Sequence, residues 1–68
     1  MTSREFIRRA RAYARRTGQP FRFDPAHGKG SHGRAYIGPR FTTISRGELR
    51  PGVLAAMLRQ LGIDRREF

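Results

Sequence analysis

Two segments of the chain repeat hydrophobic residues at the 3.6-residue period of an amphipathic helix. The first runs from residue 3 to residue 17, and Thr2 and Glu5 have the spacing of a capping box at its start. Gly18 supplies a left-handed C-terminal residue, and Pro20 prevents continuation. The hydrophobic positions of this segment are Phe6, Ile7, Ala10, Tyr13 and Ala14. The pattern therefore predicts a helix over residues 3–17.

The second helical segment begins at Pro51, which suits the first turn of a helix because its missing N–H would have no partner there. Gly62 ends the segment, and Ile63 is placed to make the hydrophobic contact of a Schellman cap. The hydrophobic positions are Val53, Leu54, Met57, Leu58 and Leu61. The last five residues, DRREF, form either a turn or a frayed end, and it stays open whether Phe68 folds back on the core.

Three short strands are predicted between the helices. Residues 21–23 and 34–37 alternate with period two, and residues 40–44 are rich in β-branched and aromatic side chains. Gly38-Pro39 separates the last two strands and predicts a hairpin. The resulting α-β-β-β-α order predicts a small two-layer α+β domain, in which a three-stranded antiparallel sheet packs against two helices.

The length and composition limit what the chain can be. At 68 residues we expect one domain over residues 1–68, and a chain of this size buries only about 60% of its unfolded surface. The absence of cysteine excludes disulfides and thiolate zinc sites. No apolar run approaches the roughly 20 residues of a membrane span, and no secretory signal is evident. A soluble, cytoplasmic protein is the default expectation.

The charge of the chain predicts a polyanionic partner. Fifteen Lys and Arg residues against five Asp and Glu residues give a net charge of +10, and fourteen of the fifteen cations are arginine. Arginine binds phosphate oxygens through two parallel hydrogen bonds, so nucleic acid is the obvious partner. An acidic protein or an anionic membrane surface would satisfy the same charge.

Part of this charge forms an arginine stripe on the first helix. Its members follow i, i+4, i+7, i+11 spacing opposite the hydrophobic positions, and they are Arg4, Arg8, Arg11 and Arg15. The stripe is either a track for phosphates or a solvated face of good helix formers. The expected lack of alternating acidic partners favours the phosphate track, because like charges one turn apart repel one another. Both interpretations stay open.

Residues 27–34, HGKGSHGR, contain no hydrophobic side chain. The glycines at 28, 30 and 33 permit positive φ and a close approach of backbone N–H groups to an anion, while Lys29 and Arg34 add charge. The spacing matches neither a Walker loop nor a dinucleotide-binding motif. In the alternative interpretation the stretch is a polar connection, Ser31 makes a local turn bond, and each histidine is a surface residue.

Several motifs together resemble the HicA family of messenger-RNA interferase toxins, which belong to type II toxin–antitoxin systems. The motifs are GKGSHGRAYIG at 28–38, TTI at 42–44, GELRPGVL at 47–54 and LRQLGI at 58–63. They cover nearly the whole chain in the right order. Two features depart from the commoner pattern: the first helix is richer in arginine, and Gln19-Pro20 stands where many relatives have an aromatic residue.

The resemblance implies a fold like that of double-stranded-RNA-binding domains and a ribonuclease activity that depends on the histidine of the glycine-serine-histidine motif. In this sequence that histidine is His32. The resemblance also implies a HicB-type antitoxin, usually encoded next door, that binds the toxin and covers the active site. It implies no role for His27.

RNA can be cleaved without a metal or a cofactor when a base removes the proton of the 2′-hydroxyl and cations stabilise the transition state. A histidine exchanges protons near neutral pH, so His32 suits either the base or the acid role, and a complementary role for His27 stays open. Lys29, Arg34 and the N–H groups of residues 30–33 can supply positive charge. The acidic residues are scattered, so we expect no metal site and no cofactor.

The expected site therefore has one catalytic residue, His32, and a set of RNA-binding or phosphate-binding residues. That set is Lys29, Gly30, Ser31, Arg34, Arg4, Arg8, Arg11 and Arg15. Ser31 is expected to shape the loop and not to act as a nucleophile, because neighbours on an extended chain point to opposite faces. Two other functions fit the same residues: a non-catalytic RNA-binding module, and a docking surface for an acidic partner protein.

Overall fold

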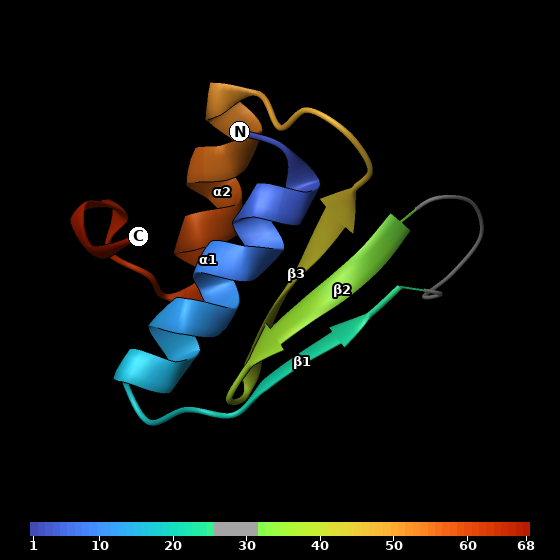
Figure 1. The fold of residues 1–68 in the computed structure, drawn as a ribbon. Helices are drawn as coiled ribbons and strands as arrows, with labels where there is room; N and C mark the ends of the chain where they lie inside the picture. The colour runs from blue at the N-terminus through green and yellow to red at the C-terminus, as the bar shows by residue number, and fades with distance from the viewer. Residues whose placement is uncertain (26–31) are drawn as a thin grey trace.

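A computed structural model describes residues 1–25 and 32–68 of the chain and confirms the predicted element order (Figure 1). The elements are α1 (Ser3–Arg16), β1 (Phe21–Asp24), β2 (His32–Ile37), β3 (Arg40–Ser45), α2 (Pro51–Leu61) and a short 3₁₀ helix (Arg65–Glu67). The three strands form one antiparallel sheet in the order β1-β2-β3, and both α-helices lie on one side of it. This α+β arrangement is compatible with the double-stranded-RNA-binding-domain-like fold that the resemblance implies.

Both α-helices end at a glycine with a positive φ, as predicted. Gly18 has φ +68° and Gly62 has φ +70°. After α2 the N–H of Ile63 donates to the Leu58 carbonyl at 2.9 Å, which is the hydrogen bond across six residues that defines a Schellman cap. None of the described helices is long and apolar enough to cross a membrane.

The predicted capping box at the start of α1 is only half formed. The side chain of Thr2 accepts a hydrogen bond from the backbone N–H of Glu5 at 3.1 Å. The carboxylate of Glu5, however, accepts from Arg8 and Arg9. Charged guanidinium donors make stronger hydrogen bonds than a neutral backbone N–H, so they hold the carboxylate on the helix surface.

The two faces of the sheet carry different side chains because residues alternate along each strand. The face toward the helices is formed by Phe21 and Phe23 of β1, Gly33, Ala35 and Ile37 of β2, and Thr42 and Ile44 of β3. We call the opposite face the open face, since no described helix packs on it. It is formed by Arg22 and Asp24 of β1, His32, Arg34 and Tyr36 of β2, and Phe41, Thr43 and Ser45 of β3.

The core lies between the sheet and the two helices, and the C-terminal turn closes one side of it. The ring of Phe68 packs on that of Phe6 with 5.0 Å between centroids, so the chain end does fold back on the core. Thr42 is fully buried, and its hydroxyl donates to the Gln60 side-chain oxygen at 2.6 Å. This hydrogen bond satisfies the one buried hydroxyl of β3 and ties the strand to α2.

Gly33 lies inside β2 and corrects one expectation about the glycine-rich stretch. It is buried and pairs with Ile44, and it is absent from the glycines with positive φ. A Cβ atom at this position would lie 2.9 Å from the carbonyl oxygen of Asp24 and 3.0 Å from two ring carbons of Phe23. The prediction that Gly33 helps to form a positive-φ anion site was therefore wrong, because the glycine is required for the close approach of β1.

We expect Gly33→Ala to destabilise the protein. The added methyl group overpacks the contact with Phe23, which costs typically about 1–3 kcal/mol of the free energy of unfolding. Chemical denaturation followed by circular dichroism measures this loss. Gly52→Ala is the matched control, since a Cβ atom there meets nothing within 4 Å. Equal stability of the two variants would contradict the packing role of Gly33.

Candidate functional site

The structure places His32 at the first position of β2, with an exposed side chain. Alternation along the strand puts His32 on the open face together with Arg34, two residues further on. Across the sheet, His32 pairs with Ser45 at the last position of β3. The predicted catalytic residue and one predicted phosphate-binding residue thus share one strand and one face.

The other predicted residues of the glycine-rich stretch lie outside the described residues. They are Lys29, Gly30 and Ser31, and His27 belongs with them. Their positions in the chain directly precede β2, so they connect to the site through His32. The described part of the site consists of the strand and its neighbours on the open face.

Arg34 is held next to an aromatic ring. Its guanidinium carbon lies 4.5 Å from the ring centroid of Phe41 on β3. Its Nε atom is buried and has no hydrogen-bond partner among the described residues. A buried unpartnered donor carries a desolvation penalty, and a bound anion or an ordered water is the usual source of the missing acceptor. Arg34 therefore lies two residues from His32 with one buried donor that lacks an acceptor among the described residues.

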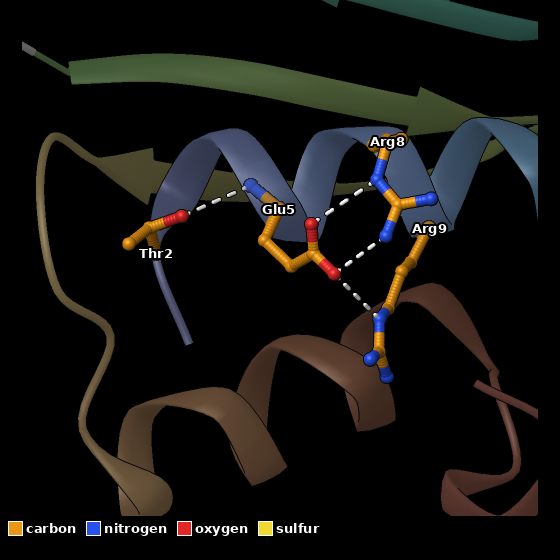
Figure 2. Close-up of polar contacts among 4 residues, drawn as sticks. All are labelled: Thr2, Glu5, Arg8 and Arg9. Atoms are coloured by element: carbon orange, nitrogen blue, oxygen red, sulfur yellow. Dashed lines mark hydrogen bonds and ion pairs between the residues drawn. The ribbon is translucent and has the colours of Figure 1, made fainter.

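The arginine stripe of α1 is exposed, as predicted, but its members have different surroundings. Arg11 lies over the ring of Phe21 at 5.2 Å from the centroid, and Arg4 faces a cavity at the start of the helix. Arg8 forms a bidentate ion pair with Glu5, with hydrogen bonds of 2.6 and 3.1 Å (Figure 2). The expectation that the stripe lacks acidic partners is wrong at Arg8, because Glu5 lies one turn before it.

The ion pair changes how Glu5 titrates. The hydrogen bond from Arg8 holds the pKa of the Glu5 carboxyl below its usual range, and the Arg9 hydrogen bond acts in the same direction. A carboxyl whose pKa is lower in the folded state stabilises the fold above its unfolded-state pKa, and this contribution is lost as the pH falls through the folded-state value. Because Glu5 is near the surface, the contribution to stability is small.

A cavity of about 380 Å³ lies between the first turns of α1 and the adjoining ends of the three strands. Its lining includes Arg4, Phe23, Gly33 and Arg46. The cavity is on the helix side of the sheet, whereas His32 and Arg34 are on the open face. Among the described residues, the structure therefore divides the predicted RNA-binding residues between the helix layer and the open face.

Sequence reasoning missed four residues at these sites. Arg46 lines the cavity, and Arg22, Tyr36 and Phe41 lie beside Arg34 on the open face. The signal for the last two was available, because a hairpin at Gly38-Pro39 places Tyr36 opposite Phe41. Arg22 of β1 could not be placed from the sequence, because alternation within one strand does not show which residue of β2 it pairs with.

Comparison of the chain with protein-family models, curated proteins and solved structures found no match. In residues 1–25 and 32–68, no three His, Cys, Asp or Glu side chains gather where they could hold a metal ion. The fold and the site define a small, strongly basic α+β domain with an exposed histidine at the start of the central strand, on the sheet face that no described helix covers.

We expect Glu5→Gln to strengthen binding to RNA if the arginine stripe contacts phosphates. The change frees Arg8 and Arg9 from their shared carboxylate, so affinity at low salt should rise roughly 2- to 10-fold with a steeper salt dependence. Fluorescence anisotropy with a labelled RNA across a salt series measures both quantities.

Glu67→Gln provides the matched control for Glu5→Gln. It changes the net charge equally but lies in the C-terminal 3₁₀ helix. Equal effects of the two substitutions would assign the change to net charge alone. No effect of Glu5→Gln would leave the stripe as a solvated face.

Proposed function

We propose that this chain is a HicA-type messenger-RNA interferase, the toxin of a type II toxin–antitoxin system, with His32 as its catalytic acid or base. The observation that best supports this function is the exposed position of His32 near Arg34 on the open face. The GSH motif at 30–32 and the GELRPGVL motif at 47–54 add the family resemblance. The fold is compatible with the one that the family implies.

The proposed reaction is a transfer of the phosphodiester to the neighbouring hydroxyl. The 2′-oxygen attacks the adjacent phosphorus, the bond from phosphorus to the 5′-oxygen breaks, and the products carry a 2′,3′-cyclic phosphate and a 5′-hydroxyl. His32 either accepts the proton of the 2′-hydroxyl or donates one to the leaving 5′-oxygen. Arg34 supplies positive charge where the phosphorane oxygens become more negative, and Lys29 is proposed to add to it.

A HicB-type antitoxin is the proposed partner, and the cytoplasm is the proposed site of action, since messenger RNA is the substrate. The exposed arginines of α1 offer a surface that attracts an acidic protein as well as RNA. An antitoxin bound across α1 and the beginning of β2 would shield His32 from RNA. Salt-dependent competition between antitoxin and RNA is the expected behaviour of such a shared surface.

The main alternative is a non-catalytic RNA-binding module of the same fold. Its strongest support is the net charge of +10, which suits phosphate binding without any chemistry. A module that reads the shape of a duplex uses cations and 2′-hydroxyl contacts, and an exposed histidine adds little to either. The role of His32 therefore separates the two functions.

We expect His32→Ala to abolish cleavage while leaving RNA binding nearly unchanged. General acid–base catalysis typically contributes about 10²- to 10⁴-fold to a rate, whereas one mostly neutral ring adds little to the affinity of so basic a protein. The assay uses the purified protein and RNA in excess EDTA, and it identifies the fragment ends. Fragments with cyclic phosphate ends from the wild type alone would support the proposed mechanism.

His27→Ala is the comparison variant, because it removes the other histidine of the same stretch. Full activity of this variant would leave His32 as the sole histidine of the reaction, and a similar loss would give His27 the complementary proton transfer. If wild type and His32→Ala both bind RNA and neither cleaves it, the ribonuclease proposal is wrong and the RNA-binding module replaces it.

A further inference from the structure

A row of flat side chains crosses all three strands on the open face. Arg22 of β1 pairs with Tyr36 of β2, and Tyr36 pairs with Phe41 of β3. The guanidinium carbon of Arg22 lies 4.0 Å from the Tyr36 ring centroid, and the Tyr36 and Phe41 centroids are 5.7 Å apart. Arg34 lies over the Phe41 ring from the side of His32. We call these four residues, Arg22, Tyr36, Phe41 and Arg34, the aromatic row.

The exposure of Phe41 is the feature that packing alone does not explain. Its side chain is 44% exposed, whereas the other large apolar residues of the three strands are buried or half-buried. The other large hydrophobic side chain with comparable exposure among the described residues is Val53, which lies on α2. Cross-strand aromatic pairing stabilises a sheet, but it does not require an arginine over each ring.

We infer that the aromatic row binds single-stranded RNA by stacking its unpaired bases. Every nucleobase has a flat π-face, and both aromatic rings and guanidinium planes stack on it. The two arginines also supply charge to the phosphates between the bases. A duplex keeps its bases stacked inside and presents sugars and phosphates, so it has little to offer to exposed rings.

The charge of the open face agrees with this ligand. The face carries Arg22 and Arg34, and Asp24 is its one acidic residue among those the structure describes. A protein partner with an apolar surface would gain from Phe41, but it would have to desolvate two arginines. Single-stranded RNA can stack its bases on the rings and pair its phosphates with the two arginines at the same time.

This inference deepens the proposed ribonuclease function and rests on it for the choice of RNA. Tyr36 is four residues from His32 on the same strand and the same face, which at a rise of about 3.3 Å per residue is about 13 Å. A single-stranded RNA whose bases stack on the aromatic row can extend along β2 toward His32. The row would then set which phosphodiester reaches His32, and it makes unpaired RNA the substrate class.

The test measures binding, separately from cleavage, with a labelled single-stranded 2′-O-methyl RNA of about 12 nucleotides and the matching duplex. The methyl groups block the attacking oxygen, so binding is measured whether or not the protein is a ribonuclease. Phe41→Leu keeps an apolar side chain on β3 but removes the ring. We expect roughly 5- to 100-fold weaker binding of the single strand, with little change for the duplex and the same salt dependence.

Two further variants control this result. Val53→Ala removes apolar surface from the other exposed position and should leave single-strand affinity unchanged. Arg22→Lys keeps the charge but loses the planar group over Tyr36, and it should weaken single-strand binding with a preserved salt slope.

Nuclear magnetic resonance of the wild-type protein gives a readout that needs no substitution, so it stands even if Phe41→Leu folds poorly. Stacked bases should shift the ring-proton resonances of Tyr36 and Phe41 upfield when the single strand is added. Unchanged ring resonances, or equal loss of single-strand and duplex affinity in Phe41→Leu, would overturn the inference. Stacking without cleavage in the EDTA assay would retain this surface and reject only the ribonuclease.

Discussion

The pairing register of β2 with β3 is the constraint on which the rest of the structure depends. Ile37 pairs with Arg40 across the Gly38-Pro39 turn, and Gly38 has a φ of +56° that favours glycine there. A slip of one residue would exchange the two faces of the strand. Ala35 and Ile37 would then lose their contact with the helices, and His32 would point toward the core.

The same register links stability to the proposed chemistry. In β2, the residues that pack against the helices alternate with the residues that face RNA in our proposal. Burial of the first set therefore fixes the positions of the second set. Gly33 contributes to both, because its missing side chain lets β1 approach and thereby brings Arg22 beside Tyr36. A histidine placed on a strand is also held more firmly than one within a loop.

The sequence was sufficient for the fold because each boundary carries a local signal. Gly18 and Gly62 adopt the positive φ expected at the ends of the helices, Gly38-Pro39 forms the predicted hairpin turn, and the hydrophobic periods identified both helices. One of the errors concerns a contact between two strands. Gly33 was assigned to an anion site because the ring of Phe23, which needs the space, comes from another strand. The packing of Phe68 on Phe6 likewise depends on residues far apart in the chain.

The candidate site was only partly predictable. His32 and Arg34 were identified from the motif and lie together on the open face, but the aromatic row emerges only when three strands are aligned. The pairing of Glu5 with Arg8 follows from their i, i+3 spacing, but the sequence analysis assigned Glu5 to the capping box with Thr2. The roles of Lys29, Gly30 and Ser31 concern residues outside the described part of the chain.

Because the described helices cover one side of the sheet, a single strand is subject to two kinds of selective pressure. In β2, positions 33, 35 and 37 are constrained by packing in the core, while positions 34 and 36 lie on the face away from the helices. Substitutions at alternate positions can therefore change the chemistry of the open face without redesigning the core. In so short a chain, this division allows one surface to diversify while the architecture stays the same.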